Sequence, residues 1–408
     1  MLLLVGLLGL PQAARGYSVL AHEAMIDAAW ETHLVPALRR RFPTATAAQI
    51  QEARAFAYGG SLIHDLGYYP FGNRLFSDLV HYVRSGDFIE ALLRESRDVD
   101  EFAFALGALA HYASDTVGHA VAVNRVVPMV YPKLAATHGQ EMLYADSPSR
   151  HVMVEFAFDV LQVGRGKFRS DVYQELLGFE VARALLERAF QATYGLPLTD
   201  LFGDTALAVG SFRHAASQLI PEITRAAWEE KRKDIQAATP ALVERDVVYS
   251  LTRQEYEQTF GTGYRKAGVL ARLVVWLGKV IPRFGPFKPL AFEPLTPPTA
   301  RLFLDSFTRA SEEYRQWLPL AARGTLSLEP RDLDTGRKTI RGANPLADKT
   351  YDALLKRLAQ EKFEEITPAL RTAINDHYAT RDSQAPAGQS AKQQRILRAR
   401  LDAMNATR

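Results

Sequence analysis

Apolar side chains recur at helical spacing along most of this chain, with polar side chains between them. Between Val19 and Arg41 the spacing predicts an amphipathic helix with a break near Pro36. Further helices are predicted over residues 46–60, 86–95, 100–126, 150–162, 172–192 and 205–237. The strict alternation that indicates half-buried strands is scarce. The pattern therefore predicts an all-α fold.

The same pattern suggests a division of the chain. Residues 17–240 are predicted to form one helical domain, and helical spacing returns near 299–320 and 345–378, so residues 241–380 are predicted as a helical extension of unknown role. Residues 380–392 are polar and lack aromatic side chains, so residues 381–408 are predicted to be a tail.

The N-terminus has the features of a signal peptide. Leu2 to Leu10 form an apolar block of the right length, far too short to span a membrane. Small residues at Ala14 and Gly16 predict cleavage before Tyr17, which makes residues 1–16 the signal and the mature protein secreted or periplasmic. The segment lacks a basic leading region, and the alternative is a buried hydrophobic N-terminal segment.

Composition narrows the chemistry. The net charge of +3, from 49 basic and 46 acidic residues, is small, and no long Lys/Arg block is present. No specific nucleic-acid partner is therefore expected. The chain has no cysteine, so any metal site must use His, Asp, Glu or backbone groups.

Candidate ligands cluster after the apolar run 102–110. His111, Asp115 and His119 are four residues apart and share one helix face, and zinc accepts this set of ligands. A second pair, His151 and Glu155, has the same spacing. The chain holds only 10 His in 408 residues, so the clustering is hard to ascribe to composition.

Three earlier residues are weaker candidates when each is taken alone. His22 lies on the first predicted helix, Asp65 precedes a loop rich in Gly and Pro, and His81 follows that loop. The histidines can equally be packed side chains, and the aspartate can be a turn cap.

Taken in order, these residues resemble the zinc-dependent bacterial phospholipase C family. That family has the ligand order mature N-terminal residue, His, Asp, His, His-x3-Asp, His, His-x3-Glu. Here the order is Tyr17, His22, Asp65, His81, His111-x3-Asp115, His119 and His151-x3-Glu155. The stretch Gly60–Asp65 looks like the family's Gly-Ser-x-x-Pro-Asp element, with His64 in place of Pro. The resemblance covers roughly residues 17–160.

The chain departs from the family in three ways. The family usually has five residues between the Asp and the next His, whereas three separate Asp115 from His119, which leaves the placement of His119 open. The mature N-terminal residue is Tyr17, where the family usually has Trp. The C-terminal third looks helical, unlike the β-sandwich of some relatives.

The resemblance implies a site with three zinc ions. One would be held by Asp65, His81, His111 and Asp115, and a second by His119, His151 and Glu155. The third would be held by His22 and the free α-amine of Tyr17, with Asp115 bridging to it from the first. Clustered divalent ions neutralise a phosphodiester and stabilise its attacking and leaving oxygens. Asp65 is the candidate to position or deprotonate the attacking water.

The implied activity is a phospholipase C-type hydrolase that acts on phospholipid headgroups at a membrane or micelle surface. Tyr68, Tyr69 and Phe71 can form an aromatic cage for a choline headgroup or can simply pack. A similar ligand order serves single-strand-specific zinc nucleases, which makes a nuclease the first alternative. A non-catalytic helical protein held together by zinc is the other alternative, although one structural ion needs fewer ligands.

Overall fold

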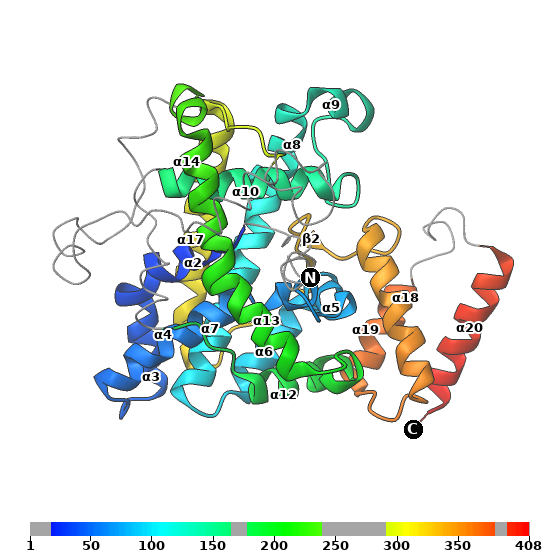
Figure 1. Ribbon diagram of the computed structural model, residues 1–408. Coiled ribbons are helices and arrows are strands. Elements are labelled where there is room, and N and C mark those ends of the chain that lie inside the picture. Colours follow the sequence, from blue (N-terminus) through cyan, green and yellow to red (C-terminus); the bar gives the residue numbers. More distant parts are fainter. Residues whose placement is uncertain (1–17, 165–177, 239–290, 380–389, 408) are drawn as a thin grey trace, which may run out of the picture.

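The computed structural model describes residues 18–164, 178–238, 291–379 and 390–407 (Figure 1). Within these ranges the fold is helical except for one short hairpin, so the predicted all-α class is confirmed. The signal peptide predicted for residues 1–16, and Tyr17 with it, lies outside the described residues.

The helices before residue 165 carry all the candidate ligands that the structure describes. They are α2 (Val19–Ala29), α3 (Val35–Arg41), α4 (Ala47–Ser61), α5 (Arg74–Tyr82), α6 (Ser85–Glu95), α7 (Val99–Gly118), α8 (Asn124–Val130), α9 (Pro132–His138) and α10 (Pro148–Gly164). Two π-helical segments, η1 (Trp30–Leu34) and η3 (His119–Val123), and a 3-10 segment, η2 (Ile63–Tyr68), join them. The first prediction, one helix broken near Pro36, matches α2, η1 and α3.

The later elements are α12 (Arg183–Tyr194), η4 (Leu198–Asp200), α13 (Thr205–His214), η5 (Ala215–Leu219), α14 (Ile220–Ala238), α17 (Pro297–Arg323), α18 (Pro345–Gln360), α19 (Pro368–Tyr378) and α20 (Ala391–Ala406). Strands β1 (Arg331–Asp332) and β2 (Arg337–Lys338) pair antiparallel, with Arg331 opposite Lys338. Residues 178–182 precede α12 without helix, so the helix predicted from 172 begins at Arg183 in the described part.

Helix α7 is the centre of the core, and α4 crosses it at very short range. A Cβ on Gly60 would lie 2.0 Å from the carbonyl oxygen of Phe104, and one on Gly107 would lie 2.1 Å from that of Ala57. Real Cβ atoms do not come so close, so glycine on both helices permits this approach. The crossing brings the C-terminal end of α4 against the ligand-bearing turn of α7.

The C-terminal part packs on the same core. The hydroxyl of Tyr314 in α17 donates a hydrogen bond to the carbonyl of Leu106 in α7 at 3.0 Å. Figure 1 shows the β1–β2 hairpin near the centre of the molecule, between α10 and α18. The boundary predicted at residue 240 lies in the segment 239–290, outside the described residues.

Most of the described part of the predicted tail at 381–408 is helical. Residues 391–406 form α20, whose first turn has a capping box from Ser390 and Gln393, and Met404 is fully buried. Polar composition hid this helix because α20 buries little apart from Met404.

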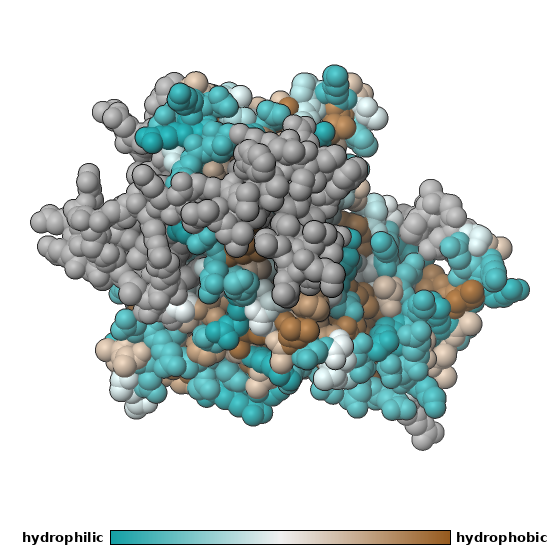
Figure 2. Space-filling model, in the orientation of Figure 1, coloured by the Kyte–Doolittle hydropathy of each residue, from teal (hydrophilic) through white to brown (hydrophobic). Residues whose placement is uncertain are grey.

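The described part of the face in Figure 2 is mainly hydrophilic, with smaller hydrophobic areas. Among the described residues, no helix combines the length and apolar character that crossing a bilayer requires.

Candidate metal centre

Eight of the predicted ligand residues are described, and all of them are buried within three neighbouring groups. In each group the possible ligand atoms lie within 4.8 Å of one another. The groups are His22, His111 and Asp115; Asp65, His81 and His111; and His119, His151 and Glu155. We call the first two, which share His111, the first centre, and the last one the second centre.

Backbone carbonyls orient the histidines of the first centre. The Nδ1 atom of His111 lies 2.8 Å from the carbonyl of Ser61, at the end of α4, and Nδ1 of His81 lies 2.7 Å from the carbonyl of Ser77. A carbonyl only accepts, so each Nδ1 carries the proton. In the neutral rings, Nε2 then has the lone pair that a metal needs.

These two Nε2 atoms face each other at 3.4 Å. Two nitrogens bound to one tetrahedral zinc lie about 3.3 Å apart, given a Zn–N distance of about 2.05 Å. Two lone pairs at that distance repel unless a cation lies between them. The donor set and its spacing therefore fit zinc.

Asp115 faces both halves of the first centre. Its Oδ1 lies 3.3 Å from Nε2 of His22, while its Oδ2 lies 3.1 Å from Nε2 of His111 and 3.5 Å from that of His81. The two oxygens thus face different histidines, as a bridging carboxylate requires. Asp65 lies on the other side of His81, with Oδ1 at 3.6 Å from Nε2.

Charge is concentrated on Asp115 and His111. Burial raises the pKa of Asp115, but His111 and the other two histidines outweigh that effect and hold the pKa well below its usual range. Burial lowers the pKa of His111, but Asp115 reverses this and raises it to about 9. Burial, followed by the charge on His111, lowers the pKa of His22 to about 4.

His64, to which the sequence gave no role, packs inside the first centre. Its ring stacks on His111 at 4.2 Å between centroids and 3° between planes, and His22 stacks on His111 at 4.2 Å as well. The ring of His111 is therefore fixed between two imidazoles. Burial, followed by His111, lowers the pKa of His64 well below its usual value, which keeps the ring neutral.

The second centre is assembled where α7 gives way to the π-helical turn η3. His119 is the first residue of η3 and is 1% exposed. A π-helical turn rotates later side chains relative to an α-helix, and such turns are frequent at functional sites. His119 lies one helical turn after Asp115 and is brought beside His151 and Glu155, which α10 contributes one turn apart.

His151 is oriented in the same manner as the first-centre histidines. Its Nε2 donates to the carbonyl of Met142 at 2.7 Å, which leaves Nδ1 as the lone-pair nitrogen of the neutral ring. Burial lowers the pKa of His151 to about 4, so the ring is neutral near pH 7.

One residue that sequence reasoning missed lies against the second centre. Asp334, in the turn of the C-terminal hairpin, is 4% exposed, and its Oδ1 is 3.0 Å from Nδ1 of His119. It lies more than two hundred residues from His119 in the chain, and no local spacing links the two.

Tyr17 lies outside the described residues, but hydrogen bonds to Asp159 hold the start of the helix that follows it. The Asp159 carboxylate accepts hydrogen bonds from the backbone amides of Leu20 and Ala21, both at 3.0 Å. Both amides belong to the first turn of α2, so Asp159 caps the helix that carries His22. Asp159 lies one turn beyond Glu155 on α10, and it therefore ties the start of α2 to the second centre.

The aromatic residues considered for a headgroup cage do not converge. Tyr68 and Tyr69 are buried, and Tyr69 packs edge-on against Phe212 at 4.9 Å. Phe71 is 64% exposed. The packing interpretation therefore fits the two tyrosines.

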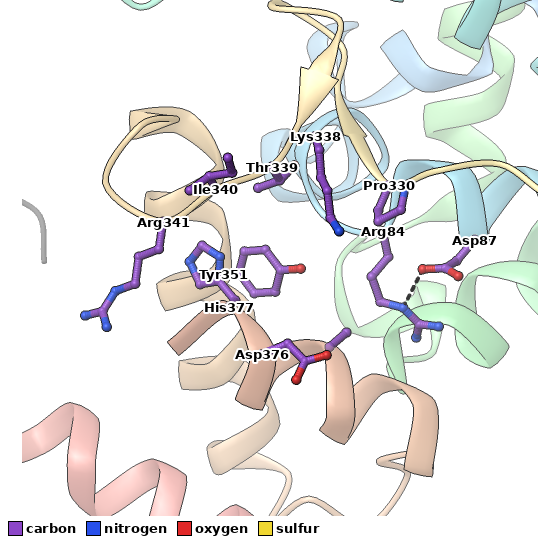
Figure 3. Close-up of a pocket in the computed structure, with 11 residues that line it drawn as sticks. Arg84, Asp87, Pro330, Lys338, Thr339, Ile340, Arg341, Tyr351, Asp376 and His377 are labelled. Atoms are coloured by element: carbon purple, nitrogen blue, oxygen red, sulfur yellow. Dashed lines mark hydrogen bonds and ion pairs between the residues drawn. The ribbon is translucent and has the colours of Figure 1, made fainter. Parts of the chain in front are cut away.

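A separate pocket of about 470 Å³ lies near the C-terminal hairpin (Figure 3). Figure 3 shows Lys338 of β2 directed toward Tyr351 and Arg84. Arg84 is already paired with Asp87 at 2.9 Å. None of the residues of the metal groups lines this pocket.

The helical fold and these neighbouring groups of imidazole and carboxylate side chains define a helical protein with candidate metal centres. The model of a family described as zinc dependent phospholipase C matches residues 21–202, so the resemblance is confirmed over that part of the chain. Comparison with curated proteins and with solved structures gives no match.

Proposed function

We propose that the protein is a secreted or periplasmic phosphodiesterase that uses three zinc ions to release phospholipid headgroups. The family match supports a zinc-dependent phospholipase C activity, and the ligand groups supply the donors for the ions. The observation that carries the proposal is the geometry of Asp115, whose Oδ1 faces His22 while its Oδ2 faces His111 and His81.

Each ligand set has a defined part in this proposal. Asp65, His81, His111 and Asp115 hold one ion, and His119, His151 and Glu155 hold another. His22 and the α-amine of Tyr17 would hold the third ion, with Asp115 as a ligand shared with the first. Bound zinc neutralises the charge of a phosphodiester and lowers the pKa of water.

Groups of the protein itself orient the attacking water, accept its proton and fix the tautomers of the histidines. Asp65 orients the attacking water and accepts its proton, because its carboxylate lies beside His81 at the edge of the first centre. Asp115 is held ionised by its histidines and cannot take that role. The carbonyls of Ser61 and Ser77 keep His111 and His81 in the tautomer that binds metal.

The test measures zinc content and hydrolysis on the mature protein beginning at Tyr17. Phosphatidylcholine and phosphatidylethanolamine vesicles are assayed for released phosphorylated headgroup, and single-stranded DNA is assayed in parallel. Close to three zinc ions per chain with phospholipid turnover supports the proposal. One ion or none overturns the trinuclear site, and cleavage of DNA alone favours the nuclease.

A further inference from the structure

The C-terminal hairpin is shaped to lie on the ligand-bearing helix. Gly336, in its turn, has φ +65°, and a Cβ there would lie 2.3 Å from the carbonyl oxygen of Thr116 in α7. The amide of Leu333 donates to the carbonyl of His81 at 3.1 Å. The hairpin thus contacts the backbone of α7 next to Asp115 and the backbone of α5 at His81.

This docking fixes the backbone of Asp334. The side-chain amide of Asn124, just after η3, donates to the Asp334 carbonyl at 2.7 Å. One carboxylate oxygen, Oδ2, accepts from the backbone amide of Tyr144 at 2.9 Å. The other oxygen, Oδ1, is thereby turned toward His119.

The contact between Oδ1 and His119 Nδ1 is short but is not a directed hydrogen bond. The two atoms are 3.0 Å apart and fully buried, yet neither has a hydrogen-bond partner of proper direction among the described residues. An oxygen and a nitrogen on one tetrahedral zinc lie about 3.3 Å apart and point at the ion rather than at each other.

We propose that Oδ1 of Asp334 is the fourth ligand of the zinc ion held by His119, His151 and Glu155. The inference rests on the proposed zinc centre. Three ligands from α7–η3 and α10 leave one position of a tetrahedral ion open, and Oδ1 of Asp334 lies 3.0 Å from Nδ1 of His119. The second centre is thereby closed by a residue beyond the segment 21–202 that matches the family.

A closed second centre has a structural consequence. Four protein ligands leave no position for water, which is typical of structural zinc sites, whereas catalytic sites keep one open. The second zinc then ties the hairpin, and with it the C-terminal part, to α7 and α10. Hydrolysis depends mainly on the ions of the first centre.

The decisive comparison is Asp334→Asn against Asp332→Asn, measured on the mature full-length protein. Asp332 is its matched control, because it is buried in the same hairpin but its oxygens accept from Asn344 and Thr335, both at 3.0 Å. Zinc per chain is measured after dialysis against a graded chelator, and Co²⁺-loaded protein is examined by visible absorption. Circular dichroism verifies the fold of both variants.

We expect Asp334→Asn to weaken one zinc equivalent by more than about 100-fold, beyond the range of an outer-shell contact. Its Co²⁺ difference spectrum should lose tetrahedral intensity as water replaces the carboxylate. Asp332→Asn should keep all ions and the spectrum. Unchanged zinc affinity in Asp334→Asn overturns the inference, and weaker affinity with an unchanged spectrum does so too, because Asp334 then acts only through His119.

A measurement on the unaltered protein covers the case in which Asp334→Asn does not fold. Amide hydrogen exchange of residues 333–336 is compared with and without zinc. We expect zinc to slow exchange in this turn, and equal exchange overturns the inference. If the unaltered protein binds no zinc at all, the proposed function fails together with the inference, whereas zinc binding without hairpin protection defeats the inference alone.

Discussion

The two centres differ in how their ligands are held. In the first centre, the ligands come from α2, η2, α5 and α7, and backbone carbonyls of α4 and α5 fix two of the histidines. In the second centre, α7–η3 and α10 supply three candidates, and a carboxylate from a distant hairpin lies against one of them. The first is a product of helix packing within the family segment, and the second also depends on the C-terminal part of the chain.

Losing Asp115 should have the largest effect, because it faces two ions. Asp115→Asn should abolish hydrolysis, with a loss well above 100-fold, and reduce zinc content by up to two ions. Glu155→Gln should cost one ion, that of the second centre. Metal analysis and phospholipid turnover of both variants test the difference between the centres. Near-native turnover of Asp115→Asn means that the bridge is misassigned.

Much of the first centre is predictable from the sequence because its ligands have helical spacing. The four-residue interval between His111 and Asp115 is visible in the chain, and so is that between His151 and Glu155. The short spacing after Asp115 does not by itself place His119, whose approach to His151 and Glu155 depends on how η3 packs against α10. Helix α5, which carries His81, is only nine residues long and was not predicted.

The remaining features depend on tertiary contacts that no local pattern encodes. His64 differs from the family motif, but its stacking on His111 depends on how η2 meets α7. Asp334 reaches His119 only because Gly336 lets the hairpin approach Thr116. Charged and glycine-containing turns of this kind are common, so the sequence alone does not single this one out.

Blocking the N-terminus should have the next largest effect and should fall on the first centre. If Tyr17 supplies its α-amine, a protein that keeps residues 1–16, or one extra residue before Tyr17, should lose one zinc ion and most activity. An amide nitrogen has no available lone pair. Cleavage before Tyr17 should restore both, and the second centre should keep its ion throughout. Equal turnover of cut and uncut protein removes Tyr17 from the ligand set.

Disturbing the α4–α7 crossing should distinguish the two centres less clearly, because it lowers the stability of the whole fold as well as zinc binding at the first centre. In Gly107→Val the new side chain meets the carbonyl of Ala57, so the helices must move apart and the carbonyl of Ser61 must leave His111. We expect a loss of about 2 kcal/mol or more in unfolding free energy, as for overpacked cores, and weaker zinc binding at the first centre. Gly203→Ala, where a Cβ meets nothing within 4 Å, is the control. Thermal unfolding and zinc titration measure both effects.

The smallest effect on the metal centres should come from Asp159, which links α2 to α10 without belonging to a metal group. Burial, only partly offset by the amides of Leu20 and Ala21, raises its pKa from 3.8 to about 7. The folded protein therefore holds a proton that the unfolded chain releases near pH 4, and stability falls as the pH rises from about 4 to 7. Asp159→Asn should remove this slope, which is at most about 1.4 kcal/mol per pH unit. Chemical unfolding at several pH values measures it, and an unchanged slope in Asp159→Asn means that another group carries the titration. Because Asn still accepts from the start of α2, His22 should stay in place and zinc content should be unchanged at pH 7.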